Sequence, residues 1–192
     1  MAKKILVISG NPKVQSFCDH LAETYAQAAA DKHSVKIVKL AELHFDPDLT
    51  HGYRKHQSLE ADLLAFQADI QWAEHVVIVT PIWWGGIPAK FKGLIDRTFL
   101  SGFAFQYEKG KSIPAKLLRG KTSRIIMTMD TPPWYYKWFQ GSPALKQLDT
   151  ATLVFSGFKR AKSNMWGPVI NAKEAQLQQW RAQAQQLGSL GL

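Results

Sequence analysis

The chain has few of the features that identify secreted, membrane-spanning or disulfide-stapled proteins. Its 192 residues include one cysteine, so no disulfide can form within the chain and a reducing compartment is expected. No apolar run reaches the roughly 20 residues needed to cross a bilayer. Lys3 and Lys4 lead directly into a short apolar run, not into a signal peptide. These absences predict a single cytoplasmic domain over residues 1–192.

The motifs of several common enzyme classes are also missing. The six histidines form no H-E-x-x-H pair and Cys18 has no second thiol beside it, so no metal site is predicted. There is no G-x-S-x-G nucleophile elbow. The first loop is neither G-x-G-x-x-G nor a Walker A sequence, which disfavours a Rossmann dinucleotide site or a P-loop there.

Acidic residues are scarce, with 15 Asp and Glu against 24 Lys and Arg, for a formal net charge of +9. Such a balance suits nucleic acid, an anionic membrane surface or small anionic ligands. The basic residues are scattered, apart from the stretch 109–124 and the cluster 159–162. A nucleic-acid-binding domain therefore has only the charge in its favour, and no nucleic-acid partner is predicted.

Apolar, β-branched runs predict five strands, at residues 5–9, 35–40, 76–80, 125–129 and 153–155. The longer runs are nearly continuous, as in strands buried on both faces of a parallel sheet. Helical periodicity fills the intervals, beginning with the capping-box pair Ser16 and Asp19. This alternation predicts a doubly wound α/β fold with the usual strand order 2-1-3-4-5. The stretch 101–124 interrupts it and predicts an arm or hairpin.

In that strand order, ligands bind in the loops beyond the carboxyl ends of the central strands. The first of these loops runs from a strand into a helix N-terminus, which favours an anion. Asn11 and Ser16 supply neutral hydrogen-bonding groups suited to phosphate oxygens. The alternative is that Ser16 only caps the helix.

The second and third loops are aromatic. Pro81, Ile82, Trp83, Trp84 and Gly85 follow the third strand, and two adjacent indoles before two glycines favour a flat-ring ligand over core or interface tryptophans. The third loop has five aromatic residues within 134–139. These wall an aromatic pocket or pack on a neighbouring subunit. Asp130 in the same loop caps a turn or hydrogen-bonds a ligand.

Taken together, these segments resemble one family. Residues 80–99, TPIWWGGIPAKFKGLIDRTF, are similar to the P-x-x-W-x-x-x-P-x-x-x-K segment of the flavodoxin-like NAD(P)H dehydrogenase (quinone) family. That family includes the small bacterial quinone reductases and the ancillary oxidoreductases of potassium efflux systems. Residues 102–105, GFAF, match its G-[FW]-A-[FY] stretch, and Gly10-Asn11-Pro12 with Ser16-Phe17 resembles its G-H-P…S-F-N. Asp130-Thr131-Pro132-Pro133 stands in place of its frequent T-T-G-G.

The resemblance implies a homodimeric flavoenzyme that passes a hydride from NAD(P)H to a quinone by a ping-pong mechanism. FMN is favoured, with FAD as the alternative. The resemblance implies that Asn11, Ser16 and Phe17 lie at the flavin phosphate. Asp130 and Thr131 would lie at the polar edge of the flavin ring. The residues implied along the ring are Pro81, Ile82, Trp83, Trp84 and Gly85. Tyr135 and Tyr107 are the implied catalytic residues, Tyr107 projecting with Phe105 into the partner's site.

Two other functions fit the same fold. One is a flavodoxin-type electron carrier, although such carriers are usually strongly acidic and this chain is basic. The other is a flavin-binding regulatory subunit, peripherally associated with a membrane transporter.

Overall fold

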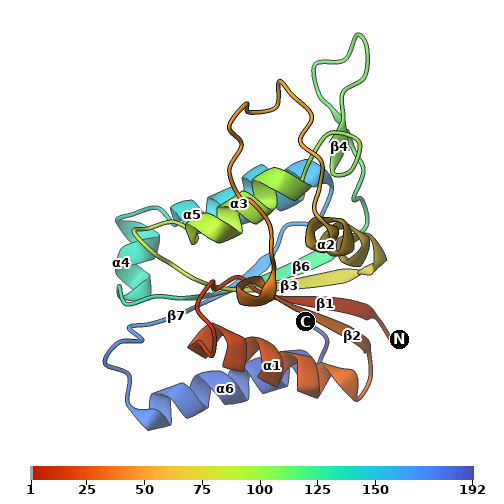
Figure 1. Ribbon diagram of the computed structural model, residues 1–192. Helices are drawn as coiled ribbons and strands as arrows, with labels where there is room; N and C mark the ends of the chain where they lie inside the picture. The colour runs from red at the N-terminus through yellow and green to blue at the C-terminus, as the bar shows by residue number, and fades with distance from the viewer. Residues whose placement is uncertain (1) are drawn as a thin grey trace.

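The computed structural model, which describes residues 2–192, has a parallel sheet between two layers of helices (Figure 1). The sheet order is β2-β1-β3-β6-β7, and every pair in it is parallel. Counted along the chain this is the predicted order 2-1-3-4-5, so the fold class is confirmed. The strands are β1 (Lys4–Ser9), β2 (Ser34–Lys39), β3 (His75–Pro81), β6 (Thr122–Thr128) and β7 (Lys162–Trp166).

The two faces of the sheet bury separate sets of apolar side chains because neighbouring residues of a strand point to opposite faces. Ile5 and Val7 belong to the core under α1 (Phe17–Ala30) and α6 (Glu174–Ser189). Leu6 and Ile8 belong to the core on the other face. That face is covered by α2 (Ala61–Trp72), α3 (Ala89–Thr98) and α5 (Pro143–Leu145), which continues into the π-helix η2 (Lys146–Val154). Two short helices, η1 (Leu40–Glu42) and α4 (Pro133–Trp138), lie in connections.

The predicted capping box at the start of α1 is present. The Ser16 hydroxyl accepts from the Asp19 amide at 3.2 Å, and the Asp19 carboxylate accepts from the Ser16 amide at 2.9 Å. The other oxygen of the buried Asp19 carboxylate accepts from the Ser9 hydroxyl at 2.5 Å. This carboxylate therefore joins the end of β1 to the start of α1 and holds the loop between them.

The fifth strand was predicted in the wrong place. Residues 153–155 lie in η2 and the helical turn after it, where Leu153 is buried with Leu148 on one helical face. The fifth strand is β7, a sheet edge paired only with β6. Its sequence KSNMW is largely polar because the strand lies at the edge of the sheet and its first two residues are exposed to solvent. It therefore lacks the continuous apolar run that marks a central strand. A three-residue apolar run cannot by itself distinguish a strand from a helix.

The aromatic third loop is partly helical: it contains α4, whose first residue is Pro133. Within 101–124 the chain forms a short antiparallel pair, β4 (Phe105–Gln106) with β5 (Ala115–Lys116), beside the helices of the upper layer in Figure 1.

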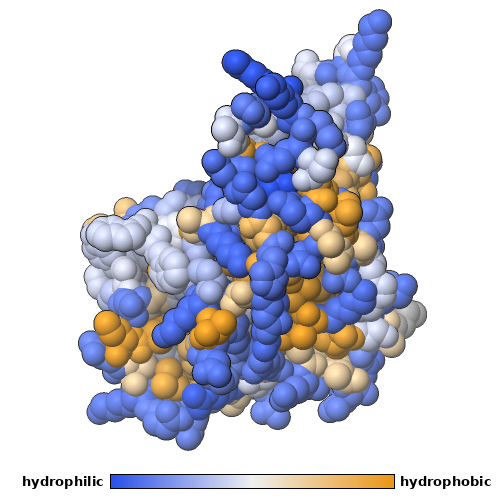
Figure 2. All heavy atoms as spheres, viewed as in Figure 1, coloured by the Kyte–Doolittle hydropathy of each residue, from blue (hydrophilic) through white to orange (hydrophobic). Residues whose placement is uncertain are grey.

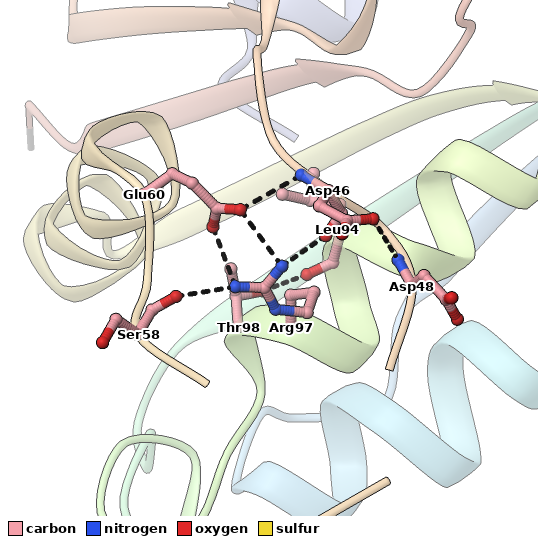
Figure 3. A network of polar contacts seen from close by, with 7 residues as sticks. All are labelled: Asp46, Asp48, Ser58, Glu60, Leu94, Arg97 and Thr98. Carbon is pink, nitrogen blue, oxygen red and sulfur yellow. Dashed lines mark hydrogen bonds and ion pairs between the residues drawn. The ribbon is translucent and has the colours of Figure 1, made fainter. Parts of the chain in front are cut away.

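A buried arginine fastens the long connection between β2 and α2 to helix α3 (Figure 3). Arg97 is 1% exposed and donates to both Glu60 carboxylate oxygens, at 2.8 and 3.2 Å. It also donates to the backbone carbonyls of Ser58, at 2.8 Å, and Asp46. Burial works against the Glu60 carboxylate, but hydrogen bonds from the Asp46 and Glu60 amides and from Arg97 outweigh it, so the pKa of Glu60 lies below its ordinary value.

We expect Arg97→Met to lower the free energy of unfolding by about 2–4 kcal/mol, because the charge-assisted hydrogen bonds from the buried guanidinium to Glu60, Ser58 and Asp46 are lost. Urea denaturation followed by circular dichroism measures this. Lys92→Met on the same helix is the control, since its pair with Asp96 is partly exposed and its loss costs less than about 0.5 kcal/mol. Equal losses in the two variants would contradict the anchoring role of Arg97.

Candidate functional site

Three loops meet at the carboxyl edge of the sheet. They follow β1, β3 and β6, which are neighbours in the sheet, so their ends lie side by side. The first residues of the loops continue the ladder across the edge: the Gly10 amide donates to the Val79 carbonyl and the Ile82 amide to the Thr128 carbonyl, both at 2.8 Å. The loops therefore start from fixed positions.

The second and third loops enclose a cleft of about 940 Å³. Six predicted site residues line it, together with two that the sequence did not single out. The lining is Ile82, Trp83, Trp84, Gly85, Asp130, Thr131, Gln140 and Pro143. Gln140 and Pro143 were missed because they follow the aromatic run in sequence and reach the cleft only where the chain turns back after α4.

The wall formed by Trp83 to Gly86 is a tight turn. The Trp83 and Gly86 backbones exchange two hydrogen bonds of 2.9 Å each. Trp84 and Gly85 between them have φ angles of 51° and 77°, the positive values found at both central positions of a type I′ turn. Glycine adopts these angles freely, whereas a tryptophan does so at a cost. The turn presents the Trp84 ring to solvent at the cleft, and Trp83 is 47% exposed.

Backbone strain is concentrated around this edge. Among residues 2–192, three non-glycine residues have positive φ: Gln15, Trp84 and Ser142. Gln15 lies in the first loop, Trp84 lies in the tryptophan turn of the second loop, and Ser142 lies just before α5. Residues in sparsely populated conformations cluster at functional sites, where the surrounding structure holds them. The positions of these three residues support this edge of the sheet as the candidate functional site.

Tyr136 anchors α4 to the tryptophan turn. Its ring is fully buried, and its hydroxyl donates to the Gly85 carbonyl at 3.2 Å. The same hydroxyl accepts from the Ala144 amide at 2.9 Å. Burial raises the pKa of Tyr136, so the hydroxyl keeps the proton that it donates. The sequence marked Tyr136 as one aromatic among five and contained no signal for this link.

In the first loop, the side chains of Asn11 and Ser16 form hydrogen bonds to nearby backbone amides. The buried Asn11 amide oxygen accepts from the Lys13 amide at 3.0 Å, and Ser16 is occupied as the cap of α1. The Phe17 ring packs on Trp180 of α6, at 6.2 Å between centroids, so its side chain points away from the cleft. The Asp19 amide donates to the Ser16 hydroxyl, so the amides of Phe17 and Cys18 are the first-turn donors that remain available to an anion.

Cys18 lies in the first turn of α1, where it is buried in the core on that face of the sheet. Its sulfur is 3.2 Å from the Thr128 hydroxyl. Burial raises the pKa of the Cys18 thiol to about 12, so it stays protonated and unreactive at neutral pH.

The remaining predicted residues lie outside the cleft lining. Pro81 is the buried last residue of β3. Tyr135, 42% exposed on α4, stacks on Phe139 with ring planes 13° apart and centroids 5.2 Å apart. Tyr107 follows β4 and packs edge-to-face on Phe105, with centroids 5.4 Å apart. Neither tyrosine lines the cleft of its own chain.

Within residues 2–192, no three His, Cys, Asp or Glu side chains are grouped so that they could hold a metal ion. No helix in that part of the chain has the length and apolar character required to span a bilayer.

The chain is similar to several known proteins. The chain is 26% identical over 218 residues to the mouse protein named ribosyldihydronicotinamide dehydrogenase [quinone], covering 98% of this chain and 92% of that one. An Alcanivorax borkumensis protein named FMN-dependent NADH:quinone oxidoreductase is 28% identical over 121 residues, covering 55% of this chain and 60% of that one. The crystal structure of Smu.1420 from Streptococcus mutans superposes with a TM-score of 0.84 at 27% identity, covering 97% and 99% of the two chains.

The family model described as flavodoxin-like fold matches residues 3–187, which is nearly the whole chain and includes all three loops. With this match and relatives named as quinone-reducing enzymes, the resemblance predicted from the loop motifs is confirmed. The chain belongs to the flavodoxin-like family.

Proposed function

We propose that the protein is an FMN-dependent oxidoreductase that transfers a hydride from NAD(P)H to a quinone. The observation that carries this proposal is the cleft walled by the tryptophan turn, at the same edge of the sheet as the anion-favouring start of α1. The names of the mouse and Alcanivorax borkumensis relatives support the same activity and the same cofactor.

The residues around the cleft fit FMN in three respects. The volume of about 940 Å³ lies at the upper end of the roughly 300–1,000 Å³ typical of small-molecule sites. Ile82 and Trp83 offer an apolar wall to a flat ring, and Gly85 adds no side chain to that wall. Asp130 and Thr131 supply polar groups on the opposite loop, and the first turn of α1 suits the phosphate.

FMN bound in the cleft would supply the two-electron chemistry of hydride transfer from NAD(P)H to a quinone in two ping-pong half-reactions. The protein contributes binding and orientation. The turn uses the Trp83 and Gly86 amides for its own hydrogen bonds, which leaves the amides of Trp84 and Gly85 for a ligand. Tyr136 keeps those two amides in place by holding the Gly85 carbonyl.

The acceptor side of the site is assigned to tyrosines. Tyr135 is exposed on α4 outside the cleft lining, and we propose that it donates a hydrogen bond to the quinone oxygen. Tyr107 is proposed to reach the cleft of a second subunit in a homodimer. A groove of about 270 Å³ lined in part by Tyr53, Phe105 and Phe155 lies at the base of the hairpin and offers an aromatic surface for that subunit.

We expect the purified protein to be yellow, or the colourless protein to bind one FMN per chain with the quenching and spectral change of a buried ring. Absorbance spectroscopy with chromatography of the released flavin measures both the stoichiometry and the identity. Binding of FAD instead would correct the cofactor. Failure to bind either flavin would contradict the proposed function and leave the fold unaffected.

We expect Tyr136→Phe to weaken FMN binding by about tenfold, because the change frees the Gly85 carbonyl and leaves the buried Ala144 amide unpaired, at about 1–2 kcal/mol. Fluorescence titration of the flavin-free variant measures the affinity. Tyr25→Phe is the matched control: it also removes a buried hydroxyl, one that donates to the Leu192 carbonyl far from the cleft. If the two variants lose FMN affinity equally, Tyr136 has no specific role in holding the turn.

We expect Tyr135→Phe to slow quinone reduction by about tenfold to a hundredfold while NAD(P)H oxidation by the enzyme keeps its rate, because a positioned proton donor acts only on the acceptor. Stopped-flow spectroscopy separates the two half-reactions, and parallel double-reciprocal plots identify the ping-pong order. A variant with both rates unchanged would remove Tyr135 from the mechanism.

A further inference from the structure

The outer side of α4 carries an unusual density of exposed aromatic side chains. Trp134, Tyr135, Trp138 and Phe139 are 59%, 42%, 75% and 72% exposed, while Tyr136 is the buried residue of the helix. With Lys137 these four residues form what we call the α4 surface. In Figure 1 the helix lies at one side of the molecule beyond the sheet, and in Figure 2 that side has the pale colour of intermediate hydropathy. Exposed apolar groups gathered in this way mark interaction sites.

The α4 surface is built as a unit. The ring centroids of Trp134 and Phe139 lie 6.0 Å apart, and those of Trp134 and Tyr135 lie 5.8 Å apart. The Lys137 ammonium lies 5.2 Å from the centre of the Trp138 ring. The rings therefore support one another in solvent, and the single buried anchor, Tyr136, fixes them to the rest of the protein.

The segment that carries this surface is positively charged. No acidic residue occurs between Asp130 and Asp149, and the stretch contains Lys137 and Lys146. Both lysines are exposed, and the whole chain has a formal net charge of +9. Tryptophan and tyrosine with lysine are the residue types that favour the headgroup region of a bilayer, where a ring meets hydrocarbon and its polar atom meets water. A protein interface core, in contrast, is depleted of lysine.

The cleft opens next to the α4 surface. Gln140 follows the surface directly and lines the cleft, and the Tyr136 hydroxyl joins α4 to the turn that carries Trp84. A planar support beneath α4 would therefore lie beside the cleft and the exposed Trp84 ring. Quinones with long apolar tails dissolve in bilayers, and an enzyme docked in this orientation receives them without their crossing water.

We propose that the α4 surface docks the protein reversibly on bilayers of anionic lipid and thereby presents the cleft to lipid-dissolved quinones. The docking stands on the aromatic and basic residues themselves. The choice of quinone as the substrate delivered there rests on the proposed function.

The test is sedimentation with vesicles of phosphatidylglycerol and phosphatidylcholine, compared with vesicles of phosphatidylcholine alone. We expect binding to the anionic vesicles that weakens as salt screens the charges. The double variant Lys137→Glu/Trp138→Ser should bind at least about tenfold more weakly, because it reverses a charge and removes an interfacial ring. The matched control is Lys109→Glu/Ile113→Ser, which makes the same charge change and removes an exposed apolar side chain on the hairpin. It should bind as the unchanged protein does.

Three results would overturn the proposal. The protein does not bind anionic vesicles, the double variant binds as tightly as the control, or the α4 surface is covered by a second copy. In the last case sedimentation without vesicles shows an assembly that Lys137→Glu/Trp138→Ser dissociates and the control does not.

Activity assays separate this proposal from the proposed function. A short-chain, water-soluble quinone should be reduced equally by the unchanged protein and the double variant, whereas a long-chain quinone embedded in anionic vesicles should be reduced more slowly by the variant. Vesicle binding without any quinone reduction would refute the enzyme and keep the docking. Reduction of both quinones at equal rates by both proteins would keep the enzyme and refute the docking.

Discussion

β3 is hydrogen-bonded in parallel to β1 on one side and to β6 on the other, and all seven of its residues are buried. Parallel strands cannot be joined by tight turns, so each must be followed by a helix that returns to the opposite edge. The three loops that leave β1, β3 and β6 are consequently forced to one edge of the sheet. The cleft, the start of α1 and the α4 surface all lie at that edge because of this pairing.

Three buried polar groups then fix the connections that the sheet alone leaves open. The Asp19 carboxylate closes the first loop, Arg97 holds the long connection after β2, and the Tyr136 hydroxyl ties α4 to the tryptophan turn. Each replaces water with several protein hydrogen bonds, which makes the group costly to remove. Rigid loops are what a ring-binding site needs, since positioning is the protein's share of cofactor chemistry.

The same edge carries a cleft and an exposed aromatic surface. The inside of the third loop contributes Asp130, Thr131 and Gln140 to the cleft, while the outside of its helix presents indole rings to solvent. Tyr136 separates the two sides. A short helix with one buried anchor therefore allows an open cleft and an exposed aromatic surface to lie side by side as separate features.

The fold class and the residues that line the cleft after β3 could be predicted from the sequence alone. Continuous apolar runs at 5–9, 76–80 and 125–129 have few conformations open to them besides buried parallel strands, and the capping box at Ser16 is a local interaction. The residues directly after those strands, among them Trp83 and Asp130, could be assigned to the cleft because strand ends meet at one edge.

The tertiary structure alone decided the features that depend on distant partners. β7 is a polar edge strand whose pairing with β6 no local pattern records, and the apolar run at 153–155 became helical because Leu153 packs with Leu148. Likewise, whether an aromatic residue of 134–139 is buried or exposed depends on Gly85 and Ala144, which the chain brings together only on folding.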